Sequence, residues 1–294
     1  MDVLLPRSLE EALAMKAERP DAMPIAGGTD VMVAVNFGRL RPPAFLDVSR
    51  VPELHELRRE DGHLYLGAGV SYSRIEHELR DFPPLVQASR SVGSPQIRRR
   101  GTVGGNLGTA SPAGDALPVL AVYEAEVEVG RAGGMTRSIP WREFLVGVKR
   151  TALEPDELIL GARWPVLRGP GSFSKIGTRN AMVIAVAGLC LMMDEDAREV
   201  RVALGSVAPT VIRAPEAEAF AAEVVADAGA WDDPTAEVPR DRVDEFATMT
   251  AAAATPIDDV RGTAAYRRHS IEVLARRALT WALEDRALPM RAVS

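Results

Sequence analysis

Two spacings of apolar residues alternate along this chain, and together they predict an α+β fold. Some segments with apolar residues at helical spacing follow a serine that suits a helix start. The serine oxygen can accept a hydrogen bond from the N–H three residues later, and a glutamate at that later position can accept one from the N–H of the serine. Ser8, followed by Glu11, and Ser73, followed by Glu76, both fit this pattern. Helices are therefore expected at residues 9–13, 73–76, 117–122, 216–227 and about 263–283.

Shorter apolar runs predict strands. Residues 125–129 alternate apolar and polar positions, as a half-buried strand does, and Gly133-Gly134 offers a hairpin turn back into the next strand. A breaker-rich stretch at residues 167–171 predicts a boundary between two domains. The strands expected are residues 45–48, 64–68, 125–129, 136–139, 185–193 and 200–204.

Composition limits the class of protein. A chain of 294 residues with 47% apolar content is long enough for about two globular domains. It has no run of about 18 apolar residues and no secretory signal at its start, so we expect a cytoplasmic protein without a membrane span. Its net charge of −6 argues against nucleic acid as a partner.

Metal-based chemistry within this chain is not expected. The single cysteine, Cys190, excludes an internal disulfide and any four-cysteine iron–sulfur or zinc site made by this chain alone. Cys190 lies in an apolar run and is interpreted as a buried small hydrophobe rather than a nucleophile. The four histidines are scattered without the spacing of metal ligands or a catalytic triad. No catalytic residue and no metal site are therefore predicted.

Two glycine-rich segments carry the strongest functional signal: Ala26-Gly27-Gly28-Thr29-Asp30 and Gly101-Thr102-Val103-Gly104-Gly105-Asn106. Adjacent glycines permit positive φ and let a ligand approach the backbone closely, so that consecutive N–H groups can converge on an anion. Either pair alone is equally typical of a tight turn or a close backbone crossing. Two such loops together suggest that both bind one pyrophosphate, from opposite sides.

Two basic clusters have open interpretations. Arg98, Arg99 and Arg100 directly precede the second glycine segment, where they suit phosphate steering, a subunit contact or a solvated stretch. A second cluster, near the C-terminus, suits an acidic ligand, a partner-facing helix or a solvated helix face. It comprises Tyr266, Arg267, Arg268, Arg276 and Arg277.

These motifs resemble a known family. The chain resembles the FAD-binding medium subunit of molybdenum hydroxylases in several stretches. These are the two glycine segments, the continuation of the second through Ala-Ser-Pro-Ala-Gly to Asp115, and the late Pro-Ile-Asp-Asp-Val-Arg-Gly run at residues 256–262. The resemblance is to the carbon monoxide dehydrogenase and xanthine dehydrogenase type, and it covers nearly the whole chain.

The resemblance implies a particular architecture. Residues 1–168 would form a two-lobed FAD-binding domain of the vanillyl-alcohol-oxidase (PCMH) type, with lobes at about 1–55 and 56–168. Residues 172–294 would form a smaller C-terminal domain, like that of the carbon monoxide dehydrogenase flavoprotein, with a three-stranded antiparallel sheet and helices.

The resemblance also implies a set of cofactor-binding residues. Asp115 would hydrogen-bond the ribitol or an adjoining group, although it equally suits a cap for a helix starting at Ala116. Ile159 would pack on the cofactor or simply belong to the core, and Lys175 would place a positive charge near the flavin or lie on the surface. The residues implied to cradle the FAD pyrophosphate are Ala26, Gly27, Gly28, Thr29, Asp30, Thr102, Gly104, Gly105 and Asn106.

The chain departs from the family pattern at two positions. Arg99 stands where the family commonly has asparagine, and Val183 replaces a frequent aspartate. The segment at residues 179–182, next to Val183, would lie near the isoalloxazine.

The function implied is an electron relay. A large partner subunit would hold the molybdenum–pterin centre and oxidise the substrate, and a small partner would carry two [2Fe–2S] clusters, in a dimer of heterotrimers. Electrons would reach FAD in this chain and leave to quinone, oxygen, NAD or another acceptor. Two alternatives remain: a free-standing flavin oxidoreductase of the same fold, which needs its own acid–base pocket, and a non-catalytic assembly subunit.

Overall fold

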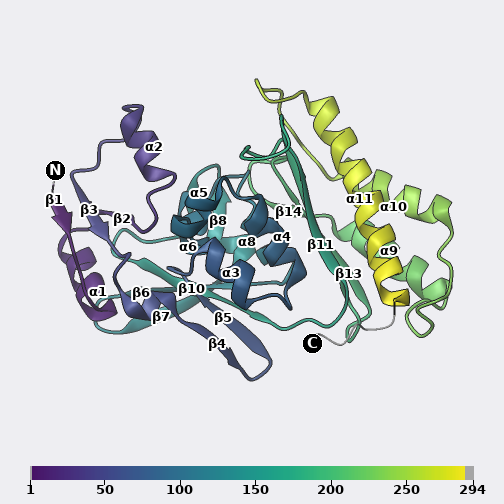
Figure 1. Ribbon diagram of the computed structural model, residues 1–294, viewed down its shortest axis with the longest axis horizontal. Coiled ribbons are helices and arrows are strands. Elements are labelled where there is room, and N and C mark those ends of the chain that lie inside the picture. The colour runs from purple at the N-terminus through teal and green to yellow at the C-terminus, as the bar shows by residue number, and fades with distance from the viewer. Residues whose placement is uncertain (1, 289–294) are drawn as a thin grey trace. The chain divides into compact units, whose positions relative to one another are not determined.

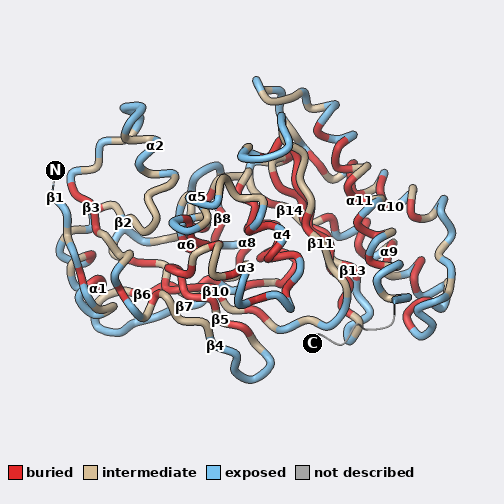
Figure 2. Tube along the Cα trace, viewed as in Figure 1, coloured by how far each residue is buried: buried red, intermediate tan, exposed pale blue. Residues whose placement is uncertain are grey.

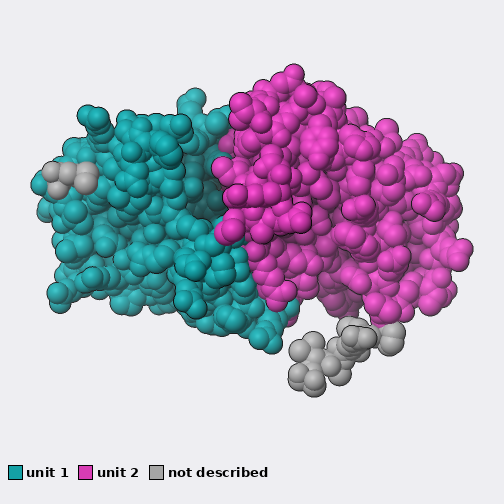
Figure 3. Space-filling model, turned by 45° about the horizontal axis from the view of Figure 1, so that its top comes forward, with its two compact units in different colours: residues 1–80, 92–111, 123–166 teal, residues 81–91, 112–122, 167–294 magenta. Residues whose placement is uncertain are grey.

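The chain forms two compact units. The computed structural model describes residues 2–288 (Figure 1). Among them, unit 1 comprises the residues up to 80 together with 92–111 and 123–166, and unit 2 comprises 81–91, 112–122 and the residues from 167 onward (Figure 3). The sequence analysis divides the chain linearly near residue 168, whereas two short earlier segments, 81–91 and 112–122, pack as part of unit 2.

Unit 1 begins with a small parallel sheet. Its strands β1 (Asp2–Leu4), β3 (Ala44–Asp47) and β2 (Met23–Ile25) lie in that order, all parallel. The helix α1 (Leu9–Glu18) packs on this sheet with Ala12 and Leu13 fully or nearly fully buried. Its start is confirmed, because the Ser8 side chain accepts the Glu11 N–H at 3.2 Å.

The second sheet of unit 1 is antiparallel. Within the described residues its strand order is β4-β5-β10-β6-β7. The hairpin predicted at Gly133-Gly134 is confirmed, because both glycines have positive φ, 82° and 72°, and join β6 to β7. The bounds are β4 (Leu57–Glu60), β5 (His63–Gly67), β6 (Glu126–Arg131), β7 (Met135–Pro140) and β10 (Leu158–Pro165).

Short elements complete unit 1. The predicted start of the second helix at Ser73 is wrong by two residues: Ser71 is the N-cap, and its side chain accepts the Arg74 N–H at 3.3 Å. The elements are α2 (Val31–Asn36), a 3₁₀ helix (Pro52–His55), α3 (Tyr72–Glu78), α5 (Pro95–Arg100), α6 (Val103–Thr109), α8 (Trp141–Phe144), β8 (Leu145–Gly147) and β9 (Arg150–Thr151).

Unit 2 is built on one antiparallel sheet in the order β11-β12-β13-β14. The predicted three-stranded sheet is therefore wrong for the described residues, because the two-residue strand β14 (Ile212–Arg213) pairs with Ala203 and Leu204 on β13. So short a segment carries no detectable alternation in the sequence. The other strands are β11 (Gly171–Ile176), β12 (Ala187–Asp194) and β13 (Glu199–Gly205), and the pairing of β12 with β13 is as predicted.

Helices cover both faces of this sheet. On one face, alternate residues of β12 such as Leu189 and Leu191 pack in a core with the three C-terminal helices (Figures 1 and 2). On the other face lie α4 (Pro83–Ser91) and α7 (Ala116–Val122). Every residue of β12 is consequently buried. The three C-terminal helices are α9 (Pro215–Asp227), α10 (Arg240–Ala252) and α11 (Ala264–Ala287), of which only α10 was not predicted.

The C-terminal basic cluster is partly structural. Arg267 is 1% exposed, and its guanidinium donates to the carbonyls of Val186 and Ser206 at 2.6 and 2.8 Å and to Asp259 at 2.7 Å. The three surface roles considered for this cluster are therefore wrong for Arg267, which instead ties the start of α11 to the sheet. The sequence gives no sign of this, because arginines are rarely buried.

No helix between residues 2 and 288 combines the length and the apolar character needed to cross a bilayer.

Candidate functional site

The two glycine segments, distant in sequence, lie side by side in unit 1. Gly27 packs directly on the backbone before the second segment, so that a Cβ at Gly27 would overlap the carbonyl oxygen of Arg100. Beyond the glycines, the Thr109 hydroxyl donates to the Asp30 carboxylate at 3.2 Å. The structure thus brings together the two segments that the sequence analysis proposed to act on one ligand.

The first segment is an open loop between β2 and α2. Gly28 has a φ of 72°, which favours glycine because a Cβ is strained there. In the part of the chain that the structure describes, the backbone N–H groups of Gly27, Gly28, Thr29 and Asp30 donate to no protein acceptor. Consecutive unpaired N–H groups form a concave donor surface that suits an anion.

The second segment is the first turn of the helix α6. The expectation of positive φ is wrong here, since neither Gly104 nor Gly105 adopts it. Thr102 is the N-cap, and its hydroxyl accepts the Gly105 N–H at 2.9 Å. The positive end of the helix dipole therefore lies at Thr102, beside the first loop.

The glycines of α6 serve two different purposes. Gly104 faces the core, where a Cβ would lie 2.5 Å from the Cβ of Ala68. Gly105 and Gly108 instead occupy one exposed face, because residues three apart share a helix face. A Cβ at Gly105 would meet nothing within 4 Å except the Thr102 hydroxyl, at 3.2 Å. This bare backbone lets a ligand approach α6 closely.

Ile159 adds an apolar neighbour to this face. It lies on β10, partly buried, and its Cδ1 atom is 3.6 Å from the position that a Cβ on Gly108 would occupy. A register shift between Ile159 and Gly161 interrupts the pairing of β10 with β6 at this point. Asn106, also on α6, is partly buried one residue beyond Gly105.

Asp115 and Lys175 form a buried ion pair within unit 2. The Lys175 ammonium lies 2.5 Å from Asp115 Oδ2, and the two side chains are 11% and 7% exposed. The Ser91 hydroxyl also donates to Asp115 Oδ2, at 2.9 Å. Burial raises the pKa of Asp115, whereas the positive charge of Lys175 and the two hydrogen bonds oppose that rise.

Lys175 also fixes the hairpin loop between β11 and β12. Its ammonium donates to the Val183 carbonyl at 3.1 Å and to the Ser91 carbonyl at 2.8 Å. Val183 packs so closely on Gly177 that a Cβ there would overlap its side chain. The valine that replaces the family's frequent aspartate is thus a packing contact across the loop.

Of the three arginines before α6, one forms an ion pair and two are exposed to solvent. Arg98 forms a largely buried ion pair with Glu76, with Nε 2.6 Å from the carboxylate. Arg99 and Arg100 are exposed. The surface interpretations therefore stay open for these two residues only.

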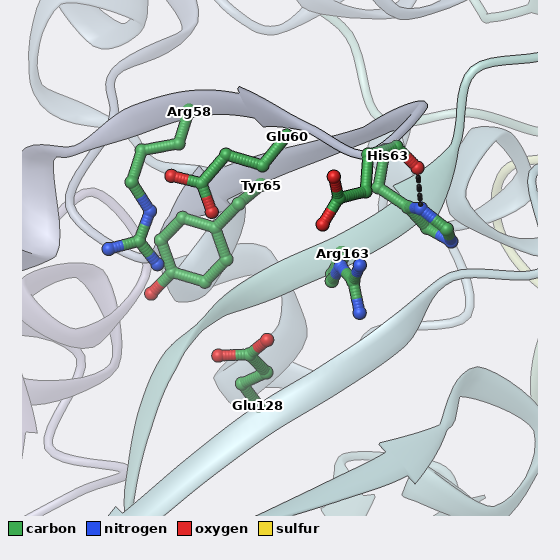
Figure 4. A pocket seen from close by; sticks show the side chains of 7 residues that line it. Arg58, Glu60, His63, Tyr65, Glu128 and Arg163 are labelled. Atoms are coloured by element: carbon green, nitrogen blue, oxygen red, sulfur yellow. Dashed lines mark hydrogen bonds between the residues drawn. The ribbon is translucent and has the colours of Figure 1, made fainter.

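Unit 1 also contains a polar groove of about 190 Å³ on the outer face of its antiparallel sheet (Figure 4). The Arg58 guanidinium lies 4.4 Å from the centre of the Tyr65 ring, and burial raises the pKa of Tyr65 to about 12. A phenol so hard to ionise is a poor general base near neutral pH. No predicted site residue lines this groove, which comprises Arg58, Glu60, Asp61, His63, Tyr65, Glu128 and Arg163.

Potential metal ligands and the single cysteine were also located. Residues 2–288 contain no group of three or more His, Cys, Asp or Glu side chains placed to hold a metal ion. The prediction that Cys190 is buried is confirmed: it is 0% exposed, and burial raises the pKa of its thiol far above the usual range.

Free N–H groups in the first loop suit an anion, and the exposed face of α6 carries no side chain at Gly105 or Gly108. Residues 1–167 match the family described as the FAD binding domain in molybdopterin dehydrogenase, and residues 172–282 match the CO dehydrogenase flavoprotein C-terminal domain. The chain therefore belongs to the family of FAD-binding subunits of molybdenum hydroxylases, as its motifs indicated.

Individual relatives agree with this assignment. The chain is 34% identical over 193 residues to the nicotinate dehydrogenase FAD-subunit of Eubacterium barkeri, a match spanning 62% of this chain and 65% of that relative. It is 30% identical over 299 residues to the 6-hydroxypseudooxynicotine dehydrogenase complex subunit alpha of Paenarthrobacter nicotinovorans, covering 99% and 96% of the two chains. A solved carbon monoxide dehydrogenase from Hydrogenophaga pseudoflava matches with a TM-score of 0.83 and 25% identity, covering 97% and 98%.

Two contributors to this site were not predicted from the sequence. Gly108 forms half of the bare face of α6, and its spacing of three from Gly105 is a signal that helical periodicity could have revealed. The bond from Thr109 to Asp30 joins the two segments and has no sequence signature.

We predict that Lys175→Met destabilises unit 2 by about 3–5 kcal/mol, because it leaves the buried Asp115 carboxylate without its cation. The double variant Asp115→Asn/Lys175→Met should be more stable than Lys175→Met alone, since no uncompensated charge remains. Urea denaturation of the wild type, both single variants and the double variant measures the coupling. A destabilisation of the double variant equal to the sum of those of the two single variants would show that the pair is not coupled.

Proposed function

We propose that this chain binds FAD and acts as the electron-transfer subunit of a molybdenum hydroxylase. In this role it passes electrons from [2Fe–2S] clusters of a partner chain to an external acceptor. The observation that carries the proposal is that the open loop at residues 26–30 packs on the backbone of Arg100 and Gly101, just before α6, and is bonded through Asp30 to Thr109, the last residue of α6. Together they present unpaired N–H groups and bare backbone to one ligand.

The geometry fits a pyrophosphate, with the two segments in different roles. The free N–H groups of Gly27, Gly28 and Thr29 would donate to phosphate oxygens. The second segment, whose Gly105 N–H is already bonded to Thr102, would contribute the positive helix end and close approach over Gly105. Bound FAD supplies the redox chemistry, and this chain holds and orients it.

Three further residues complete the proposed site. Ile159 would pack against the cofactor from its place beside Gly108. Family resemblance assigns Asp115 to the ribitol or an adjoining polar group of the cofactor and Lys175 to the flavin ring. Their mutual ion pair means that they would present a nearly neutral pair of hydrogen-bonding groups rather than an isolated positive charge.

Substrate oxidation and the iron–sulfur clusters would belong to partner chains. With one cysteine in 294 residues, this chain cannot supply the four thiolates of a [2Fe–2S] cluster. The partners are then a large molybdenum–pterin subunit and a small iron–sulfur subunit, in a dimer of heterotrimers in the cytoplasm. In this proposal the FAD-binding domain spans residues 1–168, with lobes at about 1–55 and 56–168, and the C-terminal domain spans 172–294.

We predict that the purified chain is yellow, releases FAD on denaturation, and does not oxidise aldehydes, purines or N-heterocycles. Visible spectroscopy, chromatography of the released flavin and substrate-dependent dye reduction test this. A colourless protein that cannot be reconstituted with FAD would favour a non-catalytic assembly subunit. Sustained turnover by the chain alone would favour a free-standing oxidoreductase and contradict the relay.

We predict that Gly105→Asp weakens FAD binding by tens to thousands of fold, because a carboxylate on this face of α6 would repel the phosphate and keep it from one or two of the first loop's charge-assisted bonds, worth roughly 1.5–3 kcal/mol each. Its circular dichroism should stay native, since the new side chain meets little protein. Gly134→Asp is the matched control: it introduces the same charge at an open turn and should leave FAD in place. Full FAD affinity in Gly105→Asp would show that α6 does not hold the cofactor.

A further inference from the structure

The short helix α5 has little apolar anchorage. It spans Pro95–Arg100, and none of its six residues is buried. Its one large aliphatic side chain, Ile97, is 37% exposed. Most helices in proteins are held by the burial of an apolar face, and that interaction contributes little to the position of α5.

Polar contacts of Arg98 hold the helix instead. The Arg98 Nε atom lies 2.6 Å from a carboxylate oxygen of Glu76 on α3, and the two side chains are each 17% exposed. The same guanidinium donates to the carbonyls of Val92 and Gly93 at 3.4 and 3.3 Å. One side chain thus ties α5 both to α3 and to the segment that precedes α5.

The end of α5 carries the backbone on which the first glycine loop packs. A Cβ on Gly27 would overlap the carbonyl oxygen of Arg100, the last residue of this helix. The next residue, Gly101, donates its N–H to the Ile97 carbonyl, and its own carbonyl accepts the N–H of Tyr72, the first residue of α3. A displacement of α5 relative to α3 would therefore move the Arg100 carbonyl against Gly27 or away from it.

The ion pair is well suited to act as this anchor. Two opposite charges that are largely withdrawn from water attract each other more strongly than an exposed pair does, and salt screens them less. If one partner loses its charge, the other is left largely buried without compensation. The remaining charged side chain would then gain hydration by moving toward water, and for Arg98 such a movement would carry α5 with it.

We propose that Glu76 and Arg98 are positioning residues for the pyrophosphate site. They act through α5, by fixing the Arg100 carbonyl against Gly27, and neither of them contacts the cofactor. The inference rests on the proposed function, in which the loop at residues 26–30 binds the pyrophosphate of FAD. Arg98 thus serves the anion site by holding its framework, whereas a phosphate-steering arginine would act through its own charge.

A neutral variant of Glu76 tests the proposal in the full chain. Glu76→Gln keeps the size of the side chain and removes its charge. The chain is freed of flavin and titrated calorimetrically with FAD. We expect the Kd for FAD to rise at least about tenfold, because the loop then holds its binding geometry for a smaller fraction of the time.

Glu78→Gln is the matched control. It makes the same chemical change two residues later on the same helix, where the Glu78 pair with Arg74 is exposed, with side chains 47% and 36% exposed. This variant should bind FAD with the wild-type Kd, because exposed ion pairs contribute little and this one does not reach α5.

Phosphorus-31 NMR of the FAD-saturated chain separates a positioning role from a general loss of stability. We expect both phosphorus resonances of bound FAD to shift in Glu76→Gln and to keep their wild-type positions in Glu78→Gln. A double-mutant cycle adds a second readout. Glu76→Gln/Arg98→Met should bind FAD no more weakly than Arg98→Met alone, because either change breaks the same pair.

The outcomes separate this inference from the proposed function. Wild-type FAD affinity in a folded Glu76→Gln variant would overturn the inference. A weaker affinity without a shift of the phosphorus resonances, or an equal loss of affinity in Glu78→Gln, would also overturn it. If Glu76→Gln lacks native circular dichroism, Arg98→Lys takes its place: it keeps the positive charge and should bind FAD more tightly than Arg98→Met, and equal affinities would contradict the inference. Absence of FAD binding by the wild-type chain would instead overturn the proposed function.

Discussion

One backbone contact brings the two functional segments together. Gly27 lies so close to the carbonyl oxygen of Arg100 that any side chain would separate the loop after β2 from the connection between α5 and α6. The contact sets an open loop of unpaired N–H groups beside the positive end of a helix, and neither feature alone defines a phosphate site. The Asp30–Thr109 bond joins the same two segments a second time.

Much of the fold could be predicted because its signals are local. Periodicity located β12, β13 and α11, and capping chemistry located α1, since both depend on near neighbours in sequence. The short strand β14 and the division into two units could not be predicted, because they depend on pairings between distant segments. Ser73 failed as a helix start because another serine, Ser71, two residues earlier, performs the same capping role.

In the candidate site, likewise, the motifs could be recognised in the sequence, whereas the position and contacts of each residue could not be predicted. The glycine motifs pointed to two segments that the structure brings together, yet the assumed positive φ holds for Gly28 and not for Gly104 or Gly105. The sequence contains no information on which glycine faces Ala68 and which faces outward, because that depends on how α6 packs. The pairing of Lys175 with Asp115 was likewise invisible, as residues 60 positions apart meet only through the fold. Family resemblance suggested the cofactor, and the structure shows that the two segments differ, one being an open loop and the other a helix start.

Measuring which ligands the flavin-free chain binds tests most directly whether these two segments bind a pyrophosphate. Calorimetric titration with FAD, FMN and ADP separates the contribution of the pyrophosphate to binding from that of the flavin ring. If the two segments provide the main contacts, FAD binds tightly, ADP competes with it, and FMN, which has a single phosphate, binds far more weakly. FMN binding as tight as FAD, without competition from ADP, would contradict a site built around the pyrophosphate.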